Sequence, residues 1–221
     1  MDQNTKKQRV AEAVLDYIDN GESLGIGSGS TVNILIENLS KVKNKIRNVV
    51  SSSVKSTELL EANGFEVSEL RDVGRLTKYI DGADEVNKDL QMIKGGGGAL
   101  TREKILAHNS NQFICIVDDS KKVDMLGKFP LPIEVIPLSR SSVSLELIKH
   151  GGRPVLRENF STDNGNLILD IHNLEIMEPI KLEKTINNIP GVVTNGIFAL
   201  DHANVLLCAS DSGIDKTDLN A

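Results

Sequence analysis

The first half of the chain alternates short apolar runs with helical patterns, and this alternation restricts the fold more than any other feature. Runs of strand length lie at residues 23–27 (SLGIG), 46–50, 65–67, 79–80 and 113–117. Helical spacing marks residues 10–18, 32–39, 56–63 and 101–108 between or beside them. Strands that alternate with helices indicate βαβ units, so we predict a mostly parallel sheet covered by helices.

The pattern changes after Pro130. The elements expected there are a strand (IEVIP), a helix from Ser141 to His150, a strand near 154–157, a hairpin turn at 163–165, a strand (NLILDI), a helix from Pro179 and a strand (VVTNGIFAL). This order is β-α-β-β-α-β, the split βαβ arrangement. The fold class we predict is therefore α/β, with a Rossmann-like domain (1–126 plus 202–221) and a smaller ferredoxin-like α+β domain (127–201). The strand NVLLCAS would return to the first sheet, and the polar tail SDSGIDKTDLNA would be loose or would form a short surface segment.

Composition excludes several classes of function. The 221 residues hold five Phe, two Tyr and no Trp, and the net charge is −6, from 25 basic and 31 acidic residues. Few aromatics argue against stacking of nucleobases, and negative charge argues against nucleic acid or an anionic membrane as a partner. The N-terminus has no apolar run and no stretch reaches the length of a membrane span, so we expect a cytoplasmic protein. Cys115 and Cys208 lie in apolar runs and are expected to be buried thiols; the histidines show no metal-ligand spacing.

A glycine-rich loop at Gly25–Thr31 lies between a predicted strand and a predicted helix. Its backbone N–H groups and the helix N-terminus suit an anion. Ser30 stands where the dinucleotide fingerprint needs glycine, and no Gly-Lys-Ser/Thr follows, so neither a Rossmann cofactor motif nor a P-loop is present. A terminal phosphate fits this loop, although a tight turn with a Ser/Thr cap would explain it equally well.

Two further motifs follow predicted strands. Asp81-Gly-Ala-Asp84-Glu85 places carboxylates where open α/β sheets bind ligands, although an acidic turn is the simpler explanation. Lys94 precedes four glycines that run into a helix, which suggests N–H donors for an oxyanion. Glu103 lies in the first turn of that helix, where glutamate is also common for its effect on the dipole. Lys121, after the FICIV strand, is a fourth candidate that would otherwise be a surface lysine.

All four motifs fall at the carboxyl ends of predicted strands, on one rim of one sheet. Together they offer an anion cradle, carboxylates, a lysine and an oxyanion loop, without a metal site, a nucleophilic Ser/His pair or a cofactor motif. The reaction that needs only these groups is proton transfer next to a carbonyl.

Several segments resemble type A ribose-5-phosphate isomerases. They are GIGSGST, SSS-x-x-ST, DGADE, MIKGGGGALTREK, DDSKKVDMLGKFPLPIEVIP and GGRP…TDNGN…IPGVVTNG…FA, in family order from about residue 5 to residue 210. The resemblance implies an aldose–ketose isomerase that interconverts D-ribose 5-phosphate and D-ribulose 5-phosphate in the pentose phosphate pathway. It also implies a sugar phosphate as the only ligand, no metal or cofactor, and a homodimer or a tetramer.

The resemblance carries roles to individual residues. Glu103 matches the general base, which works through a cis-enediolate. Asp81 matches the residue proposed to help open the furanose ring. Lys94 and the N–H groups of Gly95, Gly96 and Gly97 would stabilise the enediolate oxygen. The remaining substrate-binding residues would be Ser28, Gly29, Ser30, Thr31, Gly82, Ala83, Asp84 and Lys121. Lys7 or the adjacent Lys6 would approach the phosphate.

Other functions remain open at this point. A sugar-phosphate deaminase, a lactonase, or a CoA transferase with Glu103 as its nucleophile would use a related site. A sugar-phosphate sensor that regulates transcription belongs to a different class, but no basic helix-turn-helix extension precedes residue 10. Trapping a glutamyl thioester would identify a CoA transferase, whereas an isomerase would form none.

Overall fold

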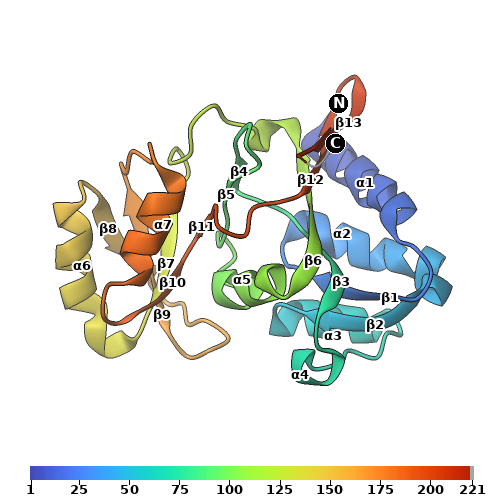
Figure 1. The fold of residues 1–221 in the computed structure, drawn as a ribbon, viewed down its shortest axis with the longest axis horizontal. Coiled ribbons are helices and arrows are strands. Elements are labelled where there is room, and N and C mark those ends of the chain that lie inside the picture. Colours follow the sequence, from blue (N-terminus) through green and yellow to red (C-terminus); the bar gives the residue numbers. More distant parts are fainter. Residues whose placement is uncertain (220–221) are drawn as a thin grey trace. The chain divides into compact units, whose positions relative to one another are not determined.

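The computed structural model describes residues 1–219 and contains two compact units (Figure 1). Unit 1 comprises Met1–Ala83, Arg102–Lys121 and the chain from Ala203 onward, and unit 2 comprises Asp84–Thr101 and Lys122–His202. Helix α5 (Leu100–His108) begins in unit 2 and continues into unit 1. The units differ from the predicted domains chiefly in residues 84–101, and the domain boundaries themselves stay a prediction.

Unit 1 contains the mostly parallel sheet. Its strands are β1 (Glu22–Ile26), β2 (Ile46–Ser51), β3 (Leu76–Asp81), β6 (Ser110–Asp118), β12 (Val205–Ser210) and β13 (Gly213–Asp218). They lie in the order β13-β12-β6-β3-β1-β2, and every neighbouring pair except β12 and β13 is parallel. The Rossmann-like sheet and the return of NVLLCAS to it are confirmed. Since β2 and β3 lie on opposite sides of β1, the chain reverses direction across the sheet at the carboxyl ends of β1 and β3.

Helices cover both faces of this sheet. They are α1 (Gln3–Ala13), α2 (Ser30–Asn38), α3 (Val54–Ala62), α4 (Leu70–Val73) and the 3-10 segments η1 (Val14–Tyr17), η2 (Leu39–Lys45) and η3 (Asp119–Lys121). Apolar residues of α1, α2 and α3 share one buried cluster with Leu24 and Ile26 of β1. Gly25 belongs to the opposite face of the sheet, because successive residues of a strand face opposite sides. A Cβ added there would lie 2.8 Å from Leu76 Cδ1 and 3.0 Å from Tyr79 Cδ2 of β3, so glycine leaves room for these two side chains, and Leu106 of α5 lies on the same face.

Unit 2 contains an antiparallel sheet with the predicted β-α-β-β-α-β order. Its elements are β7 (Leu131–Val135), η4 (Pro137–Ser139), α6 (Arg140–Lys149), β8 (Arg153–Leu156), β9 (Leu167–His172), α7 (Pro179–Asn187) and β10 (Val192–Asn195). The strand order is β10-β7-β9-β8 and each neighbouring pair is antiparallel. Val143 and Leu147 of α6 and Ile186 of α7 are buried with Ile133 of β7 and Ile171 of β9. The ferredoxin-like arrangement is confirmed.

A small third sheet in unit 2 was not expected. It consists of β4 (Glu85–Val86), β5 (Met92–Ile93) and β11 (Ile197–Phe198), in the order β11-β5-β4. The predicted strand VVTNGIFAL is divided at Gly196 into β10 and β11. A Cβ at Gly196 would lie 2.3 Å from the carbonyl oxygen of Lys94, and the Lys94 N–H donates to the Gly196 carbonyl at 2.9 Å. Glycine at this break therefore lets two backbone segments meet.

One predicted strand, and one of the two alternatives for the polar tail, were wrong. Residues 65–67 make a single parallel bridge, between Val67 and Val49, instead of a strand. The polar tail is ordered as β13 through Asp218, because pairing of an edge strand uses backbone groups and needs no apolar side chains. Residues 220–221 lie outside the described chain.

Candidate active site

The loop after β1 lies at the switch point of the unit 1 sheet. Gly29 has φ +101°, which favours glycine, and α2 begins at the next residue, Ser30. Gly29 and Ser30 are exposed, whereas Ser28 and Thr31 are partly buried. The loop therefore presents the N-terminus of α2, which attracts anions.

Asp81 ends β3 with a fully buried side chain. Its Oδ1 accepts from the N–H groups of Ser28 (3.1 Å) and Gly82 (2.7 Å), and its Oδ2 accepts from the Tyr79 hydroxyl. A Cβ at Gly27 would lie 1.9 Å from Asp81 Cγ, so only glycine lets the loop approach this carboxylate. These donors fix the orientation of the Asp81 carboxylate at the end of β3.

Tyr79 was not singled out from the sequence. Burial, the charges of Asp81 and Glu103, and the hydrogen bond to Asp81 together hold the pKa of the Tyr79 phenol well above its ordinary value. The phenol therefore stays protonated and remains a donor to Asp81. A signal did exist: residues two apart on a strand share a face, and Tyr79 precedes Asp81 by two.

Glu103 lies in the first turn of α5 and its side chain is buried. Ser28 Oγ donates to Glu103 Oε1 at 2.6 Å. Ser28 thus binds Asp81 through its backbone and Glu103 through its side chain. Within unit 1, the structure brings together Ser28, Asp81 and Glu103, three residues that are far apart in the sequence.

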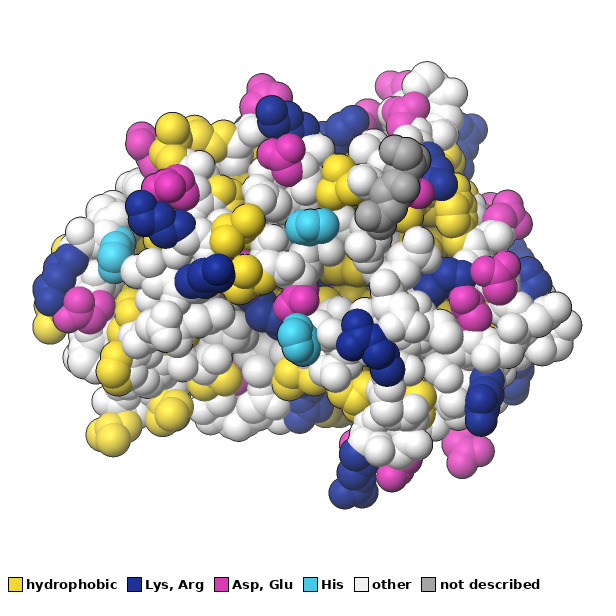
Figure 2. Space-filling model, in the orientation of Figure 1, with side chains coloured by type: hydrophobic (Ala, Val, Ile, Leu, Met, Phe, Trp, Pro, Cys, Tyr) yellow, Lys and Arg dark blue, Asp and Glu magenta, His cyan; other side chains and the backbone are white. Residues whose placement is uncertain are grey.

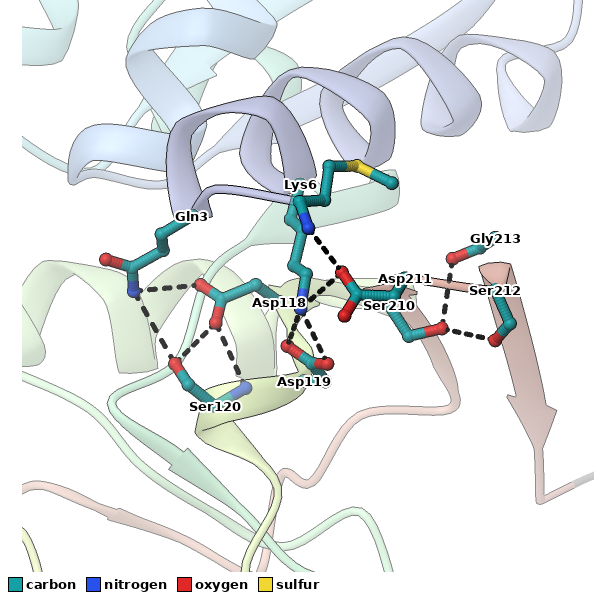
Figure 3. A network of polar contacts seen from close by, with 10 residues as sticks. Gln3, Lys6, Asp118, Asp119, Ser120, Ser210, Asp211, Ser212 and Gly213 are labelled. Atoms are coloured by element: carbon teal, nitrogen blue, oxygen red, sulfur yellow. Dashed lines mark hydrogen bonds and ion pairs between the residues drawn. The ribbon is translucent and has the colours of Figure 1, made fainter.

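Lysines of unit 1 differ in their surroundings. Lys6 donates to both carboxylate oxygens of Asp119, each at 2.9 Å, and forms an ion pair with Asp211 at 3.2 Å (Figure 3). The positive charge of Lys6 is therefore balanced by two carboxylates. Within 1–219, no hydrogen bond or ion pair links the side chain of Lys7 to another residue, so Lys7 is the better candidate cation for a phosphate.

Lys121 ends η3, directly after β6. Burial tends to raise the pKa of the nearby Asp118, but hydrogen bonds from Ser120 and Gln3, with a smaller effect of the Lys121 charge, outweigh burial and hold that pKa below its ordinary value. Gln3 and Ser120 meet Asp118 in the network drawn in Figure 3. This network connects the start of α1 to the loop that carries Lys121.

Unit 2 holds the remaining predicted residues. Lys94 follows β5 with its side chain buried, and its Nζ lies 5.4 Å from the ring centroid of Phe198 in β11. The Asp84 N–H donates to the Ile93 carbonyl at 2.8 Å, and Asp84 Oδ2 accepts from the Gly96 N–H at 2.8 Å. The N–H of Gly96 is therefore occupied by Asp84. No residue of the described chain accepts from the N–H of Gly97, and a Cβ added at Gly97 would meet no atom within 4 Å.

The glycine run is held from one side by residues that sequence reasoning missed. Arg157 Nη1 donates to the carbonyls of Gly95 (3.3 Å) and Gly96 (3.1 Å). Gly98 has φ +88°, and a Cβ there would lie 2.1 Å from the Phe160 ring. Arg157 and Phe160 lie outside the motifs that drew attention to the glycines, and no spacing signal points to them.

The described residues were also compared with the requirements of a metal site and of a membrane-spanning helix. Residues 1–219 contain no group of three or more His, Cys, Asp or Glu placed to bind a metal ion. None of the helices in that range is long and apolar enough to cross a membrane. Cys115 and Cys208 are buried in β6 and β12, as predicted. Basic and acidic side chains are interspersed on the face shown in Figure 2.

Comparison with known proteins identifies the family. The model of the family "Ribose 5-phosphate isomerase A (phosphoriboisomerase A)" matches residues 48–213. A ribose-5-phosphate isomerase A from Buchnera aphidicola (subspecies Acyrthosiphon pisum, strain Tuc7) is 53% identical over 214 residues, which cover 97% of this chain and 96% of that protein.

Solved structures agree. The enzyme of that name from Neisseria gonorrhoeae has a TM-score of 0.96 at 48% identity, covering 98% of this chain and 97% of its own. A D-ribose-5-phosphate isomerase in complex with phospho-erythronic acid has a TM-score of 0.95 at 35% identity, covering 99% and 100%. With its loop at the switch point, its buried Asp81 and Glu103, and these matches over nearly its whole length, the chain belongs to the ribose 5-phosphate isomerase A family.

Proposed function

We propose that this chain isomerises D-ribose 5-phosphate to D-ribulose 5-phosphate with Glu103 as the general base. Family membership makes the chain an isomerase that acts on this sugar phosphate. The observation that carries the mechanism is the buried Glu103 carboxylate in the first turn of α5, oriented by the Ser28 hydroxyl at 2.6 Å. A base held in one orientation abstracts a carbon-bound proton far better than a mobile one.

The proton transfer proceeds in two steps. Glu103 takes the proton from C2 of the open-chain aldose, the C–H electrons form the C1=C2 double bond, and the C1 oxygen becomes the enediolate oxyanion. Glu103 then returns the proton to C1 while the proton of the C2 hydroxyl passes to the C1 oxyanion, so that C1 carries a hydroxyl and C2 becomes the ketone. A carboxylic acid and a carboxylate alternate at Glu103, and no external oxidant or reductant is needed.

Negative charge that develops on oxygen needs fixed donors. We propose Lys94 and the N–H groups of the Gly95–Gly97 loop for this role. The Gly97 N–H is the best placed of these, since the Gly96 N–H donates to Asp84. Preorganised donors of this kind act mainly in the transition state, so their loss should lower kcat.

The remaining roles concern substrate binding and ring opening. Asp81, which is held by hydrogen bonds from Ser28, Gly82 and Tyr79, would accept the hydroxyl proton when the furanose ring opens. Gly82, Ala83 and Asp84 would contact the hydroxyl groups of the sugar. The phosphate would bind to the loop Ser28–Thr31, with Lys7 and Lys121 supplying positive charge.

The wider setting is proposed on the same grounds. The chain would work in the cytoplasm in the pentose phosphate pathway, as a homodimer or tetramer, with neither nucleic acid nor membrane as a partner and without a cofactor. Light scattering of the purified chain would decide the oligomeric state, and activity should persist when a chelator is added.

Isomerisation in D₂O tests the proposal. Proton transfer through an enediolate exchanges hydrogen with solvent, so ribulose 5-phosphate should carry deuterium at C1, detectable by NMR. Deuterium at C1 would exclude a hydride shift, and no conversion of ribose 5-phosphate would contradict the function. The variant Lys94→Ala should lose about 3–4 kcal/mol of transition-state stabilisation, expressed in kcat. A change in KM alone would instead make Lys94 a binding residue.

A further inference from the structure

The carbonyl groups of the glycine loop face a guanidinium that no motif predicts. Arg157 follows β8 and reaches the carbonyls of Gly95 and Gly96 with one nitrogen, Nη1. Its other nitrogens form a bidentate pair with Asp170 of β9, Nε to Oδ2 at 2.8 Å and Nη2 to Oδ1 at 2.5 Å. The Phe160 ring centroid lies 5.2 Å from Arg157 Cζ. Arg157 is thus fixed on three sides, and it belongs to unit 2 together with the loop it contacts.

Because trans peptides are planar, the contact of Arg157 with two carbonyls also fixes the direction of the N–H groups that follow them. In a trans peptide the C=O of one residue and the N–H of the next point in opposite directions. The Gly95 carbonyl points to Arg157, so the Gly96 N–H points away from it, and Asp84 accepts that N–H at 2.8 Å. The Gly96 carbonyl also points to Arg157, so the Gly97 N–H points away from it too.

Glycine by itself would not maintain this orientation. A glycine run has more backbone freedom than any other sequence, so its peptides can rotate unless something holds them. The turn bond from the Gly98 N–H to the Gly95 carbonyl, at 2.9 Å, constrains one peptide of the loop. Arg157 is the group that constrains the next one, between Gly96 and Gly97. A cation on the carbonyl oxygen also polarises the peptide and strengthens its N–H as a donor.

We propose that Arg157, held by Asp170, is a positioning residue that orients the Gly97 N–H for the enediolate oxygen. This inference rests on the proposed function, because the oxyanion role of the loop comes from there. Arg157 does not touch the reacting atoms in this account. It acts through the peptides of Gly95, Gly96 and Gly97.

The test compares two ligands that differ in charge at the reacting end. Phospho-erythronic acid carries a carboxylate there, which resembles the enediolate oxygen, whereas ribitol 5-phosphate carries a neutral alcohol. Arg157→Ala should weaken binding of phospho-erythronic acid at least about tenfold and lower kcat to a similar degree. Misoriented N–H groups would stabilise a negatively charged oxygen less well, whereas a neutral hydroxyl depends on them little. KM and binding of ribitol 5-phosphate should change little. A purely structural role would weaken both ligands together.

Graded variants and a matched control complete the design. Arg157→Lys keeps the charge but not the bidentate fork, so it should fall between wild type and Arg157→Ala. Asp170→Asn leaves the guanidinium in place and should give a smaller loss in the same direction, which keeps the test available if Arg157→Ala fails to fold. Arg153→Ala removes an exposed arginine from β8 and should leave kcat and both affinities unchanged.

The outcomes separate this inference from the proposed function. Unchanged kcat in Arg157→Ala, or equal weakening of both ligands, would overturn the positioning role alone. Normal kcat in Lys94→Ala and in a variant of the base, Glu103→Gln, would overturn the proposed mechanism, whatever Arg157 does.

Discussion

Asp81 and Asp118 occupy matching places in the unit 1 sheet, yet their surroundings differ. Each is the last residue of a parallel strand, β3 or β6, and both side chains are buried. Asp81 accepts from the loop after β1 and from Tyr79, beside the same Ser28 that binds Glu103. Asp118 accepts from Ser120 and Gln3, which fastens helix α1 to the loop after β6 (Figure 3).

The difference shows that a carboxylate at a strand's carboxyl end is not by itself a functional group. Asp81 lies at the switch point of the sheet with a second buried carboxylate held through Ser28, whereas Asp118 lies one strand away and connects secondary-structure elements. Chemistry needs the first arrangement, because proton transfer requires more than one positioned group.

Parallel substitution of the two aspartates tests this contrast most strongly. Asp81→Asn should lower kcat for ribose 5-phosphate by about 10²-fold or more, since the variant cannot accept a proton. Asp118→Asn should change kcat less than threefold. Steady-state kinetics on both variants checks the prediction, and a comparable loss of kcat in the two would remove the distinction.

Ser28 connects the two carboxylates, and its hydroxyl gives the next largest effect. Ser28→Ala removes a hydrogen bond to a charged group, worth about 1.5–3 kcal/mol, so kcat should fall about 10- to 100-fold. Ser28→Thr keeps a hydroxyl and should retain most of the activity. Equal activity of the alanine and threonine variants would show that the Ser28–Glu103 contact does not orient the base.

The smallest expected effect concerns acid stability at Asp118. Its folded-state pKa is lowered, so its contribution to stability is present above the unfolded-state pKa of about 3.9 and is lost as pH falls through the folded-state pKa. Urea unfolding of wild type and Asp118→Asn should therefore differ at pH 7, by about 1 kcal/mol, and converge below pH 4. A difference that persists undiminished in acid would mean that the charge of Asp118 contributes nothing.

Much of the fold followed from the sequence, because it depends on local patterns. Apolar periodicity located every strand of the two main sheets except β13, and Asp-Asn-Gly together with the order of elements identified the ferredoxin-like arrangement. The sheet β11-β5-β4 could not be predicted, since its strands contain two residues each and give no periodicity. The tail strand β13 was missed because its pairing with β12 is made by the backbone and leaves no apolar signal.

The residues of the candidate site also fall into two groups, those that the sequence indicated and those that only the structure revealed. Residues with a motif of their own, such as Glu103 and Lys94, were found from the chain. Tyr79, Arg157 and Phe160 were not found, because their importance lies in three-dimensional contacts. Tyr79 donates to the Asp81 carboxylate, which Gly27 approaches closely, and Arg157 and Phe160 contact the glycine run. The roles of all these residues in catalysis stay predictions.

The central claim is that Glu103 moves the proton, and the kcat of Glu103→Gln measures it most directly. Glu58→Gln, which changes an exposed glutamate of α3, is the matched control. Glu103→Gln should fold normally and bind the sugar phosphate with little change, while its kcat falls at least about 10²-fold, because the amide cannot accept the C2 proton. A kcat within a few-fold of wild type would contradict the account and require another base.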